Sequence, residues 1–60
     1  MINVAFITYE QDVVESVRDF HEIEFTSNHV VFRMDEFDKN MVIAIKADRI
    51  IELEVKKEEE

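Results

Sequence analysis

The chain has no cysteine, glycine or proline among its 60 residues. Without cysteine the chain forms no disulfide and no thiolate zinc site. Without glycine it has no glycine-rich loop that could cradle a phosphate. Its turns must therefore use residues such as Asn and Asp, which tolerate left-handed backbone and hydrogen-bond to their own main chain.

Basic residues are also scarce, with seven against 15 acidic ones and a net charge of −8. Such a surface repels nucleic acid and anionic membranes, and the few basic residues are scattered, so we expect no direct nucleic-acid or membrane binding. The acidity has two interpretations, solubility and mimicry of a DNA backbone. The candidate acidic surface comprises Glu22, Glu24, Asp35, Glu52 and Glu54.

A long apolar run is missing as well. No stretch approaches the roughly 18–20 apolar residues that span a bilayer, and residues 1–9 lack the basic start of a secretion signal. We therefore expect a cytoplasmic protein. The length allows one small domain, which we place at residues 1–55, followed by a frayed acidic tail at residues 56–60.

What the chain has in abundance is alternation of apolar and polar residues over four or more positions, which is typical of half-buried strands. The alternating segments are residues 22–26, 30–35, 42–46 and 51–56. They predict an all-β fold, an antiparallel five- to six-stranded meander or half-open small barrel. In residues 12–21, Val13, Val17 and Phe20 also recur at helical spacing, so an α+β fold with one short helix there is the alternative.

Turns are expected at Asn28, at residues 38–40, at residues 10–12 and, as a bend or bulge, at residues 46–49. The strands between them have one apolar face and one charged face. The predicted inner face comprises Ile23, Phe25, Val30, Phe32, Met34, Ile43, Ile45, Ile51, Leu53 and Val55. The predicted outer face comprises Glu22, Glu24, Arg33, Asp35, Lys46, Glu52 and Glu54.

Several apolar residues remain that one buried sheet face does not accommodate. Of these, Tyr9, Phe20, Val31 and Phe37 are the candidate protein-contact residues. Residues 2–7 are apolar on both faces, which predicts a strand that is covered on both sides. A homodimer, formed by pairing of edge strands or by stacking of the sheets, would provide this cover, and Ile2, Val4 and Phe6 mark the candidate dimer strand.

Catalytic chemistry has little support in the sequence. Asp19 and His21 share a strand face, but no third ligand at a metal-site spacing accompanies them. Ser16, Asp19 and His21 have no segment that would form an oxyanion hole. The carboxylates of residues 22 and 24 alternate as a solvated strand face does. We therefore expect no enzyme activity, no cofactor and no metal.

Residues 17–34, VRDFHEIEFTSNHVVFRM, and residues 40–55, NMVIAIKADRIIELEV, carry a resemblance over most of the chain. They resemble the small acidic β-meander accessory proteins of phages and mobile elements of Gram-positive bacteria, in which a hairpin precedes an ending that residues 45–55 approximate. The resemblance implies a phage accessory protein in the host cytoplasm. Many such short proteins inhibit host defence systems by binding one of their proteins.

The sequence thus favours a non-enzymatic inhibitor or adaptor that pairs with itself and occludes the surface of an unidentified protein. Apolar anchors supply affinity in such interfaces and surrounding charges supply selectivity. A DNA mimic that inhibits a nucleic-acid-binding protein and a structural subunit of a larger assembly are the alternatives.

Overall fold

Six antiparallel strands form the fold in the computed structural model, which describes residues 1–59. The strands are β1 (Ile2–Tyr9), β2 (Val14–Arg18), β3 (Glu22–Phe25), β4 (His29–Glu36), β5 (Lys39–Lys46) and β6 (Ile50–Glu58). Two single 3-10 turns, η1 (Glu10–Asp12) and η2 (Ala47–Arg49), are the helical elements of the described residues. None of these helical elements is long and apolar enough to cross a bilayer.

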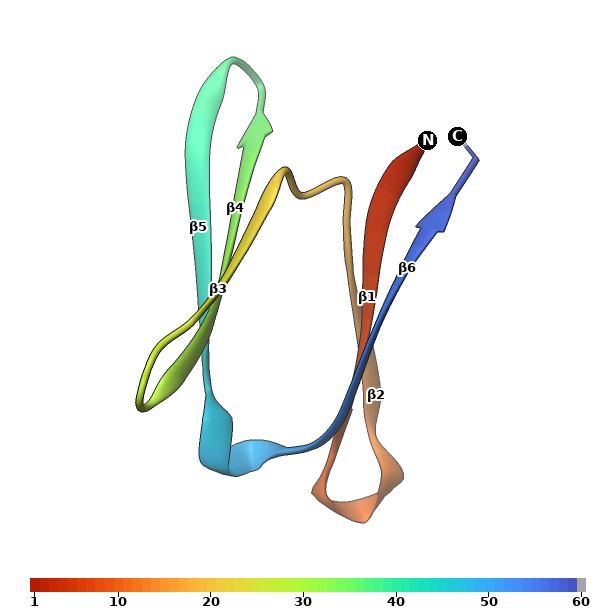
Figure 1. The fold of residues 1–60 in the computed structure, drawn as a ribbon, viewed down its shortest axis with the longest axis vertical. Helices are drawn as coiled ribbons and strands as arrows, with labels where there is room; N and C mark the ends of the chain where they lie inside the picture. Colours follow the sequence, from red (N-terminus) through yellow and green to blue (C-terminus); the bar gives the residue numbers. More distant parts are fainter. Residues whose placement is uncertain (60) are drawn as a thin grey trace.

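The strands make two three-stranded sheets, a first sheet in the order β2-β1-β6 and a second in the order β3-β4-β5. The second sheet is a meander, whereas β6 returns to pair with β1, so that Ile2 lies opposite Glu58. Figure 1 shows the two sheets on either side of the molecule, joined at one end by η2, with the start of β1 and the end of β6 at the other end of the first sheet. The predicted all-β antiparallel class is confirmed, and the sheets do not close into a barrel.

The helix considered for residues 12–21 is wrong, because β2 occupies residues 14–18. The strand ends at Arg18, and the next residue, Asp19, has a left-handed φ of 58°. There the Asp19 backbone N–H donates to the Asn3 carbonyl at 2.8 Å, and the Asn3 side-chain amide donates to the Phe20 carbonyl at 2.8 Å. These bonds to β1 stabilise the break in the strand, and the valines of β2 favour extended backbone.

Three of the four expected turns occur where the sequence places them. Residues 10–12 form η1, in which Gln11 and Asp12 have positive φ, and residues 47–49 form η2. The turn at residues 26–28 is closed by the Thr26 hydroxyl, which accepts the His29 backbone N–H at 2.9 Å. The fourth turn lies earlier than expected, because residues 39 and 40 already belong to β5.

The core lies between the two sheets. Its buried residues are Ala5, Ile7, Tyr9, Val17, Phe20, Val30, Phe32 and Met34. The rings of Phe20 and Phe32 pack edge to face, with centroids 5.1 Å apart. Of the predicted inner face, Phe25, Ile51 and Val55 are 65%, 64% and 48% exposed. Phe25 and Val55 lie on the edge strands β3 and β6, whereas Ile51 is skipped in the register of β6 with β1, where a bulge brings Ile50 opposite Tyr9 instead.

Strand β1 is the central strand of the first sheet, and this position explains its two apolar faces. Ala5 and Ile7 belong to the core cluster, whereas Val4 is fully buried on the opposite face. An ion pair of 3.3 Å between Arg18 of β2 and Glu58 of β6 crosses β1 on that face.

The ammonium group of Lys56 lies 5.6 Å from the ring centroid of Phe6. Cover for β1 thus comes from within one chain. Because β2 and β6 occupy both edges of β1, Ile2, Val4 and Phe6 do not pair edge to edge with a second copy. A dimer in which the sheets stack through this strand stays a prediction.

The last strand extends further than the sequence indicates. Residues 56–58 pair with residues 2–4 of β1, so the predicted start of a frayed tail at residue 56 is too early. Glu60, also assigned to that tail, lies outside the described residues.

Candidate functional site

The tip of the β4–β5 hairpin is the most unusual local structure in the described chain. Glu36 of β4 pairs with Lys39 of β5, so Phe37 and Asp38 form a two-residue loop. Their φ values are 52° and 60°. Two-residue hairpin loops of this kind require left-handed backbone at both positions and therefore prefer Asn-Gly or Asp-Gly. The second position fits that preference, and the first does not.

A bulky residue such as Phe is a genuine outlier in the left-handed region. For an L-residue, left-handed backbone costs about 1–2 kcal/mol, because Cβ approaches the following carbonyl oxygen. Packing of the side chain does not offset this cost, because Phe37 is 87% exposed. Strain that the fold does not need is a marker of functional positions.

The surroundings of Phe37 are acidic. Glu36 and Asp38 flank it directly, and within the described residues neither carboxylate has an ion pair or a side-chain hydrogen bond. Figure 1 shows the hairpin tip at the end of the molecule away from η2. We define the tip site as residues 36–38, a single exposed aromatic ring between two free carboxylates. The sequence reasoning missed the two carboxylates, although their position beside Phe37 was a signal.

Two of the four candidate contact residues are not available for contact. Tyr9 and Phe20 are 8% and 3% exposed and belong to the core cluster. The prediction of a surface role for them is wrong because it assumed one buried sheet face, whereas two sheets bury residues from both sides. Val31 is half-buried in the middle of β4, opposite Ala44, and Phe37 is the one fully exposed member of the four.

The Tyr9 hydroxyl lies near η1 and η2. It donates a long hydrogen bond of 3.5 Å to the Glu15 carboxylate, and the Arg49 guanidinium lies 5.3 Å from the ring centroid. Burial raises the pKa of Tyr9 above its ordinary value of 10.0, and the charge of Glu15 adds to this while Arg49 opposes it. Beside these groups is an open hollow of about 490 Å³, which Glu10 and Asp48 also line.

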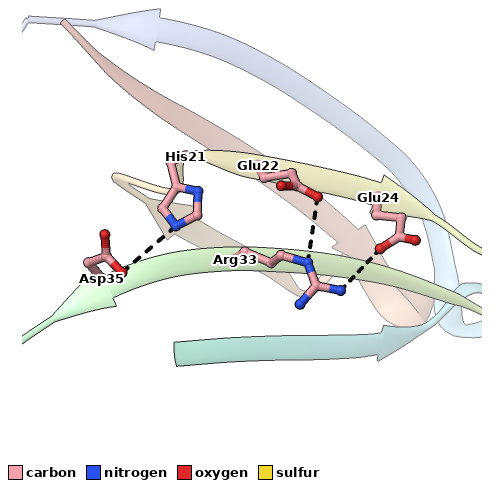
Figure 2. Close-up of polar contacts among 5 residues, drawn as sticks. All are labelled: His21, Glu22, Glu24, Arg33 and Asp35. Atoms are coloured by element: carbon pink, nitrogen blue, oxygen red, sulfur yellow. Dashed lines mark hydrogen bonds and ion pairs between the residues drawn. The ribbon is translucent and has the colours of Figure 1, made fainter. Parts of the chain in front are cut away.

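Two acidic residues of the second sheet, Glu22 and Glu24, are paired with the same cation. Figure 2 shows Arg33 between two carboxylates, with Nε 3.5 Å from Glu22 and Nη2 3.2 Å from Glu24. In the same row, His21 Nε2 lies 3.9 Å from Asp35. These pairs are exposed, so each contributes at most about 1 kcal/mol. The main effect of Arg33 is to reduce the negative charge of this face.

The remaining candidate acidic residues, Glu52 and Glu54, lie on β6 in the first sheet. Glu54 forms a 3.0 Å ion pair with Lys56, and its hydrogen bond to the ammonium raises the pKa of Lys56. The five carboxylates are therefore divided between two sheets. The structure does not bring them together as one acidic surface.

Among the described residues, no group of three or more His, Asp or Glu side chains is placed to hold a metal ion. No protein-family model, no curated protein and no solved structure matches this chain. The tip site therefore has to be interpreted from its own geometry.

Proposed function

We propose that this chain is a non-enzymatic protein-binding protein that inserts Phe37 into an apolar pocket of its partner and occludes the surface around that pocket. The strained and exposed Phe37 is the observation that carries the proposal. Aromatic residues, Phe among them, are enriched in protein interfaces, and a few side chains in desolvated pockets supply most of the affinity there.

The acidic flanks of the anchor indicate the chemistry of the partner. The free carboxylates of Glu36 and Asp38 favour a pocket whose rim carries Lys or Arg. Charges at the rim of an interface accelerate association and select the partner, whereas the anchor supplies most of the affinity. Following the resemblance to phage accessory proteins, we propose a bacterial defence protein as the partner.

A DNA mimic is less well supported. It needs carboxylates in a continuous array that is free to replace phosphates, yet Arg33 and Lys56 pair with three of the five candidates, Glu22, Glu24 and Glu54. Salt separates the two mechanisms. The affinity of a phosphate mimic falls steeply with salt, whereas that of an apolar anchor changes little.

The test is affinity capture from a bacterial lysate with three versions of the chain: wild type, Phe37→Asn, and Phe25→Asn as the matched control. Phe25 is also exposed, but it lies in β3. We expect a protein that the wild type and the control capture and Phe37→Asn does not. With the purified protein, calorimetry should give a dissociation constant at least about 30-fold weaker for Phe37→Asn, as for a hot-spot residue.

Equal capture by the wild type and Phe37→Asn would refute the anchor. A dissociation constant that rises by orders of magnitude between low and moderate salt would favour the mimic instead.

A further inference from the structure

The four strand edges of the two sheets differ in how well they are protected from pairing with another strand. An exposed edge presents unpaired backbone N–H and C=O groups, and natural proteins protect it with charged side chains or by keeping the strand short. The first sheet ends in β2 and β6, and the second in β3 and β5.

Three of these edges are protected. Strand β3 is only four residues long. Strand β2 carries Glu15 and Arg18 among its five residues. Strand β6 alternates charged with apolar residues and ends in Lys56, Lys57 and Glu58. None of them offers a long uncharged edge.

Strand β5 is the exception. Between Lys39 and Lys46 it has six uncharged residues, NMVIAI, and β4 occupies only one of its edges. In an antiparallel ladder alternate residues direct their backbone groups to opposite sides, so about half of the backbone groups of β5 point away from β4. On the outer face of this strand Val42 is 55% exposed. The edge is thus long, flat and uncharged.

We propose that β5 pairs antiparallel with β5 of a second copy, so that the two second sheets join into one six-stranded sheet. Two copies of one strand pair in this way about a two-fold axis normal to the sheet. Residues that pair across the junction must point to the same face of the sheet. This holds only if, at the axis, one residue of β5 pairs with the same residue of the second copy.

Charge selects which residue lies on the axis. With Val42 on the axis, Asp38 lies opposite Lys46 of the second copy at both ends of the junction. With Met41 on the axis, Lys46 would lie opposite Glu36, which belongs to β4 and does not reach this edge. With Ile43 on the axis, Lys46 would lie opposite the neutral Asn40. The register centred on Val42 is the one that gives Lys46 an acidic partner on the edge.

The first test is sedimentation of the wild type, Val42→Lys and Val14→Lys. Val14 is the matched control, because it is 59% exposed on the edge strand β2. Val42→Lys places two ammonium groups side by side on the axis, whereas in a single copy this lysine reaches water. We expect the wild type and Val14→Lys to be dimers at micromolar concentration, and Val42→Lys to be a 7.2 kDa monomer with an unchanged β circular dichroism spectrum.

The second test uses the absence of cysteine. In the proposed register the Cα atoms of the two Val42 residues are about 4.5–5.5 Å apart, within the range of a disulfide. Val42→Cys should therefore form a covalent dimer under mild oxidation. Ala44→Cys, displaced by two residues on the same face, should remain reduced at matched concentration, because the two thiols would lie about 13 Å apart along the strands.

Three results would overturn the proposal. One is a wild type that stays monomeric up to millimolar concentration, which would mean that the edge of β5 pairs with a strand of another protein instead. Another is a dimer that survives Val42→Lys but not Val14→Lys, which would place the contact on β2. The third is faster oxidation of Ala44→Cys than of Val42→Cys, which would show a different register. None of these tests depends on the anchor role of Phe37.

Discussion

At the scale of single residues, the backbone angle of Phe37 separates its role from that of the other aromatic residues. Phe20 and Phe32 contribute their whole surface to the core. Phe37 buries almost none of its surface, and its left-handed backbone conformation is unfavourable for an aromatic residue. A residue type that disfavours its own backbone conformation is expected at positions that serve binding and not stability.

The first prediction is that Phe37→Asn stabilises the protein. Asn tolerates left-handed backbone and is preferred at the first loop position of such hairpins, so the free energy of unfolding should rise by about 1 kcal/mol. In a chain of this size the thermal midpoint should rise by about 4–8 °C. Phe25→Asn, in extended backbone, should not stabilise. A lower midpoint for Phe37→Asn would show that the Phe37 ring supports the fold.

The second prediction concerns Tyr9, the only tyrosine in the chain. Its pKa is raised in the folded state, chiefly by burial and then by Glu15. Absorbance of tyrosinate during an alkaline titration should therefore show a midpoint above 10.0 in the native protein, returning to the ordinary value in denaturant.

The sign for stability follows from linkage. The unfolded chain releases the tyrosine proton at lower pH than the folded chain. The stability that the protonated Tyr9 contributes is therefore fully present below pH 10 and is lost as the pH rises through the pKa of the folded state. Tyr9→Phe should lack this alkaline decline. A native midpoint at or below 10.0 would mean that the Tyr9 hydroxyl is open to water.

At the scale of the elements, the position of a strand in its sheet determines what its apolar residues do. Strand β1 is apolar on both faces because it is central, with the core on one side and the Arg18–Glu58 ion pair on the other. Strand β5 has similar residues but lies at an edge, where the same composition leaves an uncovered surface.

The third prediction is that removal of residues 56–60 destabilises the fold. The deletion removes three residues of β6 that pair with β1 and uncovers Val4. Exposure of one valine and loss of several backbone hydrogen bonds together should lower the free energy of unfolding by about 2–4 kcal/mol, as measured in urea. Removal of residues 59 and 60 alone is the control and should have little effect. Equal stability of the two truncated chains would show that the end of β6 is dispensable.

At the scale of the whole molecule, small size and the open arrangement act together. A 60-residue chain without disulfides has a small margin of stability, and its two sheets leave Phe25, Ile51 and Val55 exposed at their edges. Pairing through β5 would add backbone hydrogen bonds to such a fold. It would also place the two Phe37 tips about 34 Å apart, at ten residues of roughly 3.4 Å each.

The fourth prediction, which rests on the proposed dimer, is that the thermal midpoint of the wild type rises with protein concentration. A partner that binds only the folded state stabilises by mass action. Val42→Lys should have a lower midpoint that does not change with concentration. A wild-type midpoint that is constant from micromolar to millimolar concentration would contradict the dimer.

The all-β class, the antiparallel pairing and three of the turns could be predicted from the sequence, because alternation and turn residues act over a few neighbouring positions. The core strand of Val30, Phe32 and Met34 was identified in the same way. These features arise from local preference, which the sequence carries directly. The exposed position of Phe37 beside a turn could be predicted from the sequence in the same way.

Only the tertiary structure decided where Tyr9 and Phe20 lie, and that β1 is central while β5 is an edge. Each depends on the return of β6 to β1, a pairing between residues about 50 positions apart that no local pattern records. The left-handed backbone of Phe37 and Asp38 was also decided by the tertiary structure. The register of β4 with β5 limits the loop to two residues, and Phe37 is one of them. That register, acting on one aromatic residue, created the candidate site.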